Sequence, residues 1–263
     1  MATLTEDGIV RHDVDGIATL TISAPKARNA ITVAMRIELL ANLREAVADA
    51  AVRAIILTGT DGNFCAGGRV APGESTKPDA ERTRRNIGYL HDIVREIVGC
   101  GKPVIAAVEG IAYGAGLSFV TACDYVVAGE GARFCAAFPK VGLAPDAGVV
   151  HTLVQRVGMA HARDILLSAR EVRTPEAVAM GLANAGVEAG GALAAARDYA
   201  AQFAYLAPLS ISAIKQMLRD DAHALENVLA AEAEVQPRLV FTRDYDEGRA
   251  AFKERRKPIF RGE

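Results

Sequence analysis

Three short runs of apolar residues, separated by stretches with helical periodicity, constrain the fold of this chain more than any other feature. The runs cover residues 54–57, 104–108 and 125–128. A strand without a polar side of its own is typical of a parallel sheet covered on both faces. Between the first two runs, apolar residues recur at helical spacing, as Ile87, Leu90, Val94 and Ile97. The alternation of strand, helix and strand therefore predicts an α/β fold.

The N-terminal part predicts a β-hairpin followed by a helix. Two β-rich runs, residues 9–14 and 17–22, flank the dipeptide Asp15-Gly16. This dipeptide tolerates the positive φ angles that a two-residue hairpin turn requires. From residue 32 to residue 49, leucines recur on one face among charged residues, which is typical of an amphipathic helix. We expect the hairpin and the strand at 54–57 to share a sheet.

The chain after Pro139 predicts helices. We expect them at 147–157 and 160–168, and a third one that begins with Thr174 as its N-cap and Pro175 at its first position. Gly181 is expected to end that helix. From residue 192 to 257, alanine-rich and charged segments alternate without strand signals, so we expect this part to be helical as well.

Composition and charge exclude several classes of protein. The chain has 263 residues, with Lys+Arg 30 and Asp+Glu 32, so its formal charge of -2 gives no broad positive field for nucleic acid or an anionic membrane. No apolar run approaches the ~20 residues that span a bilayer. The N-terminus carries acids and lacks the features of a secretory signal, so we expect a cytoplasmic protein. The four cysteines have no C-x-x-C spacing, which predicts free thiols and no metal site.

Two glycine-rich stretches follow predicted strands. Residues 64–69 (Phe-Cys-Ala-Gly-Gly-Arg) come after the run at 54–57, and residues 110–116 (Gly-Ile-Ala-Tyr-Gly-Ala-Gly) come after the run at 104–108. Loops beyond the carboxyl ends of parallel strands line the ligand crevice of an open α/β sheet. A helix that begins there presents unpaired backbone N–H groups. The two turns can therefore supply two donors, although each is also explained as a simple tight turn.

Together with residues 25–30 (Pro-Lys-Ala-Arg-Asn-Ala), the two stretches resemble the crotonase (enoyl-CoA hydratase/isomerase) superfamily in order and spacing. Residues 102–108, 122–124 and 142–146 extend the resemblance over almost the whole chain. It implies a crotonase-like α/β fold of repeated ββα units in a core at 1–200, with a helical trimerisation region at 201–263. It also implies an acyl-CoA substrate, no cofactor other than the coenzyme A of that thioester, and a homotrimer or a hexamer (a dimer of trimers).

The resemblance assigns roles to the glycine-rich turns. In the family, the backbone N–H groups at the positions of Gly68 and Ala115 form an oxyanion hole for the thioester carbonyl. Lys26 or Arg28 is expected near the phosphates of CoA and Ala66 near its adenine, with a solvated basic loop as the alternative. The residues that the resemblance places along the substrate are Lys26, Arg28, Ala30, Ala66, Gly67, Gly68, Arg69, Tyr113, Gly114, Ser118, Phe138, Phe252 and Lys253.

The acid and base residues indicate which reaction this chain catalyses. Hydratases of the family carry two glutamates where this chain has Ser118 and Phe138, and neither side chain titrates near neutrality. Asp146 occupies the place where several isomerase-type and dehalogenase-type members have their working aspartate. One carboxylate is enough to move a proton between the α- and γ-carbons of a 3-enoyl thioester. The sequence therefore favours an enoyl-CoA isomerase, and an N-cap of the following helix is the competing role for Asp146.

Other functions stay open or are disfavoured. A hydratase with a non-standard acid and base, or a non-catalytic acyl-CoA-binding homologue, is the alternative. Dehalogenation ranks low because the chain has no tryptophan. Phe119 replaces the third glycine of a dinucleotide-binding fingerprint, and Val120 the second glycine of a serine-hydrolase elbow.

Three further polar side chains have no firm role in the sequence. His91 and His151 lie on predicted helices and receive no role. Arg69 stands where the family often has Asp; it is expected to be a surface residue or to contact a phosphate or an acidic acyl group.

Overall fold

A six-stranded sheet forms the centre of the part of the chain that the structure, a computed structural model, describes: residues 7–69, 80–219 and 242–263. The strands lie in the order β1-β2-β3-β4-β6-β9, and every neighbouring pair is parallel except β1 and β2. Their bounds are Gly8–Val14, Ile17–Ser23, Ala54–Gly59, Val104–Val108, Tyr125–Gly129 and Ala185–Val187. The predicted parallel sheet is confirmed.

The N-terminal hairpin is also confirmed. Val14 pairs with Ile17, and the two residues between them, Asp15 and Gly16, have φ angles of 51° and 74°. Two consecutive positive φ angles match the twist of the flanking strands, which is why Asp-Gly suits this turn. β2 then pairs in parallel with β3, beginning at Ile17 and Ala54, so the hairpin shares the sheet with the first buried strand.

A second, three-stranded sheet was not expected. It consists of β5 (Ile111–Tyr113), β7 (Arg133–Cys135) and β8 (Val172–Arg173). β5 and β7 are parallel, and β7 and β8 antiparallel. Strands of two or three residues are too short for a periodic pattern to reveal. The prediction of helices alone after Pro139 is therefore wrong at β8 and β9.

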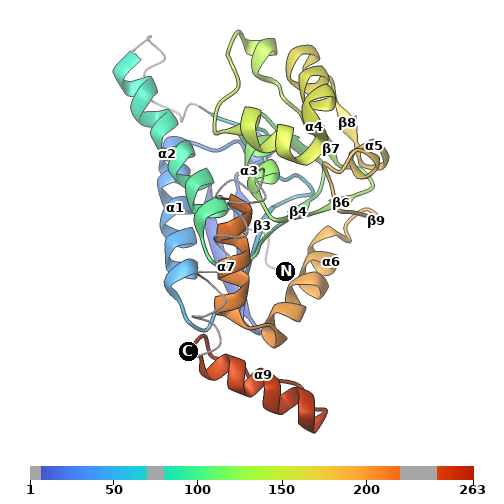
Figure 1. Cartoon of the computed structure of the whole chain (residues 1–263). Coiled ribbons are helices and arrows are strands. Elements are labelled where there is room, and N and C mark those ends of the chain that lie inside the picture. Colours follow the sequence, from blue (N-terminus) through green and yellow to red (C-terminus); the bar gives the residue numbers. More distant parts are fainter. Residues whose placement is uncertain (1–6, 70–79, 220–241) are drawn as a thin grey trace.

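Helices cover both faces of the large sheet, α1 to α3 on one face and α6 on the other. The described α-helices are α1 (Val33–Ala48), α2 (Ala80–Gly99), α3 (Ala115–Ala122), α4 (Val149–Ser168), α5 (Thr174–Ala179), α6 (Ala192–Ala201), α7 (Pro208–Arg219) and α9 (Arg243–Glu254). Short 3₁₀ helices are η1 (Pro25–Ala27), η2 (Phe138–Val141) and η3 (Gln202–Tyr205). Figure 1 shows α1 and α2 side by side and α9 at the lower end of the molecule, away from the sheet. Among the described residues beyond 192, the predicted helical character is confirmed.

The core explains why the central strands are almost entirely apolar. Ile55 and Leu57 of β3 belong to the larger cluster, which α1, α2 and α3 cover, whereas Ala54 and Ile56 pack on the side of α6. Alternate residues of a strand point to opposite faces, so a sheet buried on both sides needs apolar residues at every position. Full burial of a side chain such as Ile56 contributes about 1.5–3 kcal/mol.

Two of the predicted helical regions differ in detail from the structure. The helices expected at 147–157 and 160–168 form one element, α4, interrupted at Gly158, where φ is 73° and ψ is 165°. Thr174 is the first residue of α5 rather than its N-cap, and its hydroxyl donates to the carbonyl of Gly129 at 2.5 Å. Gly181, with φ of 84°, follows α5 as expected.

The side chain of Lys215 ties helix α7 to the core. The Lys215 ammonium donates to the carbonyl of Lys102 at 2.9 Å and contacts the Asp124 carboxylate at 2.5 Å. This contact joins the C-terminal helices to the start of β4. The proposed boundary between a core at 1–200 and a C-terminal region at 201–263 stays a prediction.

All four cysteines are buried free thiols. In the ranges that the structure describes, no helix has both the length and the apolar character needed to cross a membrane. Nor do the described residues bring three or more His, Cys, Asp or Glu side chains together as metal ligands.

Candidate active site

The two glycine-rich turns lie against each other. The N–H of Cys65 donates to the carbonyl of Ile111 at 2.9 Å, and the N–H of Tyr113 donates to the carbonyl of Cys65 at 2.9 Å. This short ladder joins the loop after β3 to β5. As a result, the segment around Gly68 lies beside the start of α3.

Glycine is required where the turns meet. A Cβ atom at Gly67 would lie 3.0 Å from the carbonyl oxygen of Tyr113 and 3.7 Å from the nitrogen of Ala115, and the φ angle of Gly67 is 100°. A Cβ atom at Gly116 would lie 2.3 Å from the carbonyl oxygen of Cys65. Only a residue without a side chain permits this approach of two backbones.

Each turn leaves at least one backbone donor unused. Ala115 is the first residue of α3, and the first donor within the helix is the N–H of Ser118, bonded to Gly114 at 3.1 Å. On the other turn, the N–H groups of Gly67 and Arg69 are bonded to the Cys65 thiol and to the carbonyl of Ile31. Within the described part of the chain, the N–H groups of Gly68 and Ala115 donate to no acceptor. They are available to a ligand oxygen.

Asp146 lies on the segment between η2 and α4, at a sharp turn of the chain. The next two residues, Ala147 and Gly148, have φ angles of 50° and 69°. A non-glycine residue in the left-handed region costs about 1–2 kcal/mol, so the packing around the fully buried Ala147 enforces this turn. Gly148 is the N-cap of α4, and no side chain caps the helix. The helix-capping role considered for Asp146 is therefore wrong.

One oxygen of the Asp146 carboxyl group is buried without a direct partner among the described residues. Its Oδ1 is inaccessible to solvent and accepts no hydrogen bond from the described residues. Burial raises the pKa of Asp146, and the charges of Arg36 and His91 oppose this shift in part. A carboxyl group with a raised pKa and a vacant oxygen is suited to accept and return a proton.

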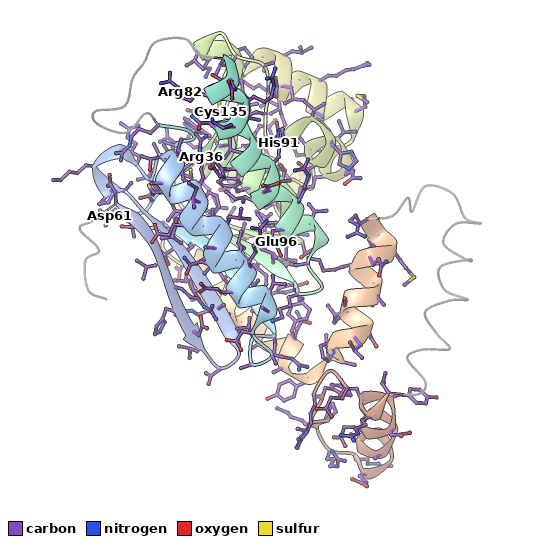
Figure 2. The ribbon with its side chains drawn as sticks, turned by 90° about the vertical axis from the view of Figure 1, so that its left-hand side faces the viewer. Arg36, Asp61, Arg82, His91, Glu96 and Cys135 are labelled. Carbon is purple, nitrogen blue, oxygen red and sulfur yellow. The ribbon has the colours of Figure 1, made fainter. Side chains whose placement is uncertain are left out.

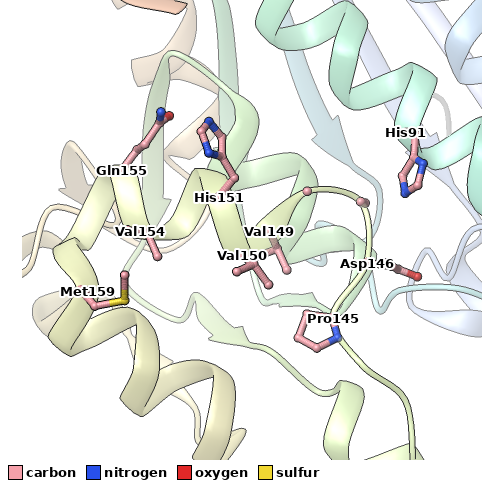
Figure 3. Close-up of a pocket in the computed structure, with 11 residues that line it drawn as sticks. His91, Pro145, Asp146, Val149, Val150, His151, Val154, Gln155 and Met159 are labelled. Carbon is pink, nitrogen blue, oxygen red and sulfur yellow. The ribbon is translucent and has the colours of Figure 1, made fainter. Parts of the chain in front are cut away.

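Asp146 borders a cavity of about 580 Å³, which is within the usual size range of small-molecule sites. Figure 3 shows it between α2 and α4, with His91 pointing from α2 toward the loop that carries Asp146. The polar lining residues are His91, Asp146, His151 and Gln155. The other named side chains around the cavity are apolar: Pro145, Val149, Val150, Val154 and Met159. The cavity can hold an apolar group beside a carboxylate.

The basic turn, residues 25–30, lies close to the first glycine-rich turn, residues 64–69. Lys26 and Arg28 are exposed on η1 and at its end, and the N–H of Ala66 donates to the carbonyl of Arg28 at 3.1 Å. Ala30 is buried. The structure therefore brings the two cations and Ala66 to one surface.

Asn29 holds this arrangement, and the sequence analysis did not single it out. Its buried side chain donates to the carbonyls of Thr60 and Asn63 at 2.8 and 2.7 Å and accepts from the N–H of Ala24 at 2.9 Å. Asparagine next to a turn is a signal for such bonding. The bonds fix the basic turn to the loop after β3.

The remaining predicted site residues differ in their surroundings. Arg69 is paired with Asp7, and the hydroxyl of Tyr113 donates to Glu171. Burial, with this hydrogen bond second, raises the pKa of Tyr113 to about 12. Phe138 is buried, with a ring atom 4.0 Å from the Cβ position of Gly114.

Ser118 is fully buried, and its hydroxyl donates to the backbone carbonyls of Gly114 and Asp146 at 3.3 and 3.2 Å. The side chains of Phe252 and Lys253 lie outside the described residues.

Arg36 is a second residue that the sequence analysis missed. It lies in the first turn of α1, where its Nη1 donates to the carbonyl of Asn86 in α2 at 3.0 Å. Its Nη2 is 2.9 Å from the place that a Cβ atom at Gly68 would take. Figure 2 shows Arg36 and His91 toward the same end of the α1–α2 pair. Nothing in the spacing of α1 distinguishes Arg36 from an ordinary polar residue on the face of an amphipathic helix.

Two sheets, with paired glycine turns beyond the carboxyl ends of parallel strands, define a crotonase-like α/β protein. The chain belongs to the enoyl-CoA hydratase/isomerase family, whose model matches residues 13–263. It is therefore an acyl-CoA-processing enzyme of the crotonase superfamily, as the motifs suggested.

Individual relatives cover almost the whole chain. A protein named "Probable enoyl-CoA hydratase" from Rhodobacter capsulatus is 36% identical, over 96% of this chain and 98% of its own. The 1,2-epoxyphenylacetyl-CoA isomerase of Escherichia coli is 30% identical, over 97% and 98%. The crystal structure of an enoyl-CoA hydratase from Polaromonas sp. JS666 superposes with a TM-score of 0.91 at 32% identity, covering 97% of this chain and 100% of that one. The predicted crotonase-like fold is confirmed.

Proposed function

We propose that this protein is an enoyl-CoA isomerase that shifts a double bond in an acyl-CoA thioester and uses Asp146 as its base. The observation that carries the proposal is the isolated carboxyl group of Asp146, buried on one oxygen at the edge of an apolar cavity. The positions of the two hydratase glutamates hold Ser118 and Phe138, both buried and without an acid group. A single carboxylate suits a reaction in which one group removes and returns the same proton.

The proposed reaction balances on the substrate itself. Asp146 takes a proton from the α-carbon of a 3-enoyl thioester, and the electron pair of that C–H bond moves to the thioester oxygen as a dienolate forms. The N–H groups of Gly68 and Ala115 donate to this oxygen. The loss of one such donor typically costs about 3–4 kcal/mol of transition-state stabilisation. Asp146 then returns the proton to the γ-carbon, which leaves the conjugated 2-enoyl thioester.

Coenzyme A is proposed to lie along the surface that the basic turn and the first glycine turn share. Lys26 and Arg28 would face its phosphates, and Ala66 its adenine. The exposure of both cations, and the bond that joins Arg28 to Ala66, support this placement. The acyl group would enter the cavity beside Asp146.

A hydratase is the second candidate, and the names of several relatives favour it. Such an enzyme must activate a water molecule and protonate carbon without the two glutamates. A non-catalytic acyl-CoA-binding homologue is the third reading, with the same contacts to coenzyme A and no turnover.

The assembly and the cellular site are part of the proposal. We propose a homotrimer or a hexamer in which residues 201–263 supply subunit contacts. A cytoplasmic location is supported by the four buried cysteines, which are free thiols and suit a reducing compartment.

One assay separates the three functions. Purified protein is mixed with a 3-enoyl-CoA and, separately, with a 2-enoyl-CoA, while the absorbance of the conjugated enoyl thioester is followed. The proposal expects a rise with the first substrate that Asp146→Asn abolishes and that the surface variant Asp198→Asn retains. A fall with the second substrate would identify a hydratase, and binding without any change would identify a non-catalytic protein.

A further inference from the structure

A single buried side chain, that of Asn29, joins the basic turn to the loop that carries Gly68. We propose that Asn29 is a positioning residue that orients the N–H group of Gly68 in the oxyanion hole. This inference rests on the proposed function, in which that N–H group donates to the thioester oxygen. It concerns the restraint on one peptide group, however, and that can be measured without any substrate.

The direction of the Gly68 N–H group is tied to that of the Gly67 carbonyl, because both belong to one peptide unit. In a planar trans peptide the C=O and N–H bonds point in opposite directions. The N–H of Ile31 donates to the Gly67 carbonyl at 2.7 Å, and the carbonyl of Ile31 accepts from the N–H of Arg69 at 3.0 Å. The N–H of Gly68 therefore points away from Ile31, and Gly68 is exposed to a ligand.

The bond to Ile31 matters because this peptide unit has little restraint of its own. Both residues that flank it are glycines, and glycine populates more backbone conformations than any other residue. Rotation of the unit would turn the carbonyl of Gly67, rather than the N–H of Gly68, toward the ligand. The orientation of the donor thus depends on how firmly Ile31 is held beside the glycine-rich turn.

Asn29, two residues before Ile31, supplies that restraint. Its Oδ1 accepts from the N–H of Ala24 and from the hydroxyl of Thr60, both at 2.9 Å. Its Nδ2 donates to the carbonyls of Thr60 and Asn63 at 2.8 and 2.7 Å. These are all the hydrogen bonds that a side-chain amide can make, and Asn29 is fully buried. A buried amide with every partner in place is restricted to one orientation.

The two segments stay together from Asn29 onward. The carbonyl of Arg28 accepts from the N–H of Ala66 at 3.1 Å, and the two bonds of Ile31 follow. Residues 28–31 therefore run beside residues 63–69. One end of this pair carries Arg28, which is proposed to face the phosphates of coenzyme A, and the other end carries Gly68. Asn29 fixes the spacing between the contact for the phosphates and the donor for the thioester.

The test removes the bonds between the segments and keeps the shape of the side chain. In Asn29→Asp the ionised carboxylate still accepts from Ala24 and Thr60 but cannot donate to the carbonyls of Thr60 and Asn63. The matched control is Asn42→Asp on α1, which loses one donor bond, to the carbonyl of Glu38 at 2.9 Å. Asn29→Gly, which permits the φ angle of 59° at this position, replaces the aspartate variant if that protein does not fold.

The direct readout is amide hydrogen exchange of the full chain without substrate, followed by mass spectrometry. In Asn29→Asp we expect the peptides that contain Ile31 and Arg69 to exchange about tenfold faster, as the loss of one or two hydrogen bonds predicts. Peptides from β4 should exchange as in the wild-type protein, and Asn42→Asp should change neither region. Unchanged exchange at Ile31 and Arg69, or an equal increase in every peptide, would overturn the inference.

A second readout reports on the oxyanion hole itself. Bound butanoyl-CoA has no double bond to shift, and its thioester carbonyl, labelled with carbon-13, can be followed by infrared spectroscopy. In the wild-type protein we expect a lower carbonyl stretching frequency than in free butanoyl-CoA, since two N–H groups donate to the oxygen. At saturation, Asn29→Asp should return the frequency toward the free value. A frequency equal to that of the wild-type complex would contradict the proposed role.

The kinetic readout is the separation of kcat from KM with the 3-enoyl-CoA. We expect kcat to fall about tenfold to a hundredfold in Asn29→Asp, the range for a misplaced oxyanion donor, and to change little in Asn42→Asp. A loss confined to KM would show that Asn29 acts only on the binding of coenzyme A. If neither enoyl-CoA reacts with the wild-type protein, the proposed function fails, and hydrogen exchange still decides the role of Asn29.

Discussion

The hydroxyl of Ser118 donates to the backbone carbonyl of Asp146 at 3.2 Å, although 28 positions separate the two residues in the chain. Ser118 belongs to α3, which begins at Ala115. The helix that presents one free N–H group therefore also holds the loop that carries the carboxylate. This bond connects the helix of the proposed oxyanion donor directly to the loop of the proposed base.

Ser118→Ala tests this connection. We expect a loss of about 1 kcal/mol in the free energy of unfolding, the usual contribution of one hydrogen bond, and a fall in kcat as the Asp146 loop loses its restraint. Denaturant unfolding and steady-state kinetics measure the two effects. Ser210→Ala, on α7, is the control and should change neither by a comparable amount. An unchanged kcat in Ser118→Ala would argue against a restraint.

Two helical glycines provide a matched pair for stability. Gly116→Ala places a Cβ atom 2.3 Å from the carbonyl oxygen of Cys65, so the two turns must separate, at a cost of about 1–3 kcal/mol or more. Gly88→Ala in α2 meets nothing within 4 Å and is expected to stabilise the protein by about 0.5–1 kcal/mol, since alanine favours a helix. Thermal or urea unfolding of both variants measures the sign of the change in the free energy of unfolding for each. A stability of Gly116→Ala equal to or above that of the wild-type protein would show that the turns are not in close contact.

The stability of Asp146→Asn is expected to depend on pH. Burial raises the pKa of Asp146 in the folded protein above that of the unfolded chain, and the charges of Arg36 and His91 offset this only in part. The carboxyl group therefore stabilises the folded state below the pKa of the unfolded chain, and this contribution is lost as the pH rises through the higher folded-state pKa.

Asp146→Asn has no such titration. We expect its free energy of unfolding to rise relative to that of the wild-type protein between acidic and neutral pH, and the difference then to level off. Urea unfolding at a series of pH values measures it. A difference that stays constant over the series would contradict the raised pKa.

Removal of the basic turn should weaken the binding of coenzyme A. For Lys26→Ala combined with Arg28→Ala, we expect the Kd of coenzyme A to rise about tenfold, or about 1.4 kcal/mol, with kcat unchanged at saturation. The loss should shrink as the salt concentration rises, because exposed charges are screened. Calorimetry at two ionic strengths measures this, with the exposed Arg163→Ala as the control. Equal affinity in the double variant and the wild-type protein would favour a merely solvated loop.

Local signals in the chain predicted a large part of the fold. Asp15-Gly16 indicated the hairpin, and the apolar runs at 54–57 and 104–108 indicated strands buried on both faces. These features are visible within a few residues. β7 and β8 were missed because they are two or three residues long and pair across some 40 positions, with Phe134 opposite Val172. No periodic pattern records such a pairing.

The candidate active site, like the fold, was predicted from the sequence only in part. The order of residues placed glycines in both turns. The resemblance to the crotonase superfamily implies that Ser118 and Phe138 stand where hydratases carry glutamates, and neither residue has an acid group. Only the tertiary structure decided three properties of Asp146. Its side chain does not cap α4, its Oδ1 is inaccessible to solvent, and the charge of Arg36 lowers its pKa against the larger effect of burial. Desolvation and Coulomb attraction depend on distance in space, and that distance is set by packing between elements far apart in the chain.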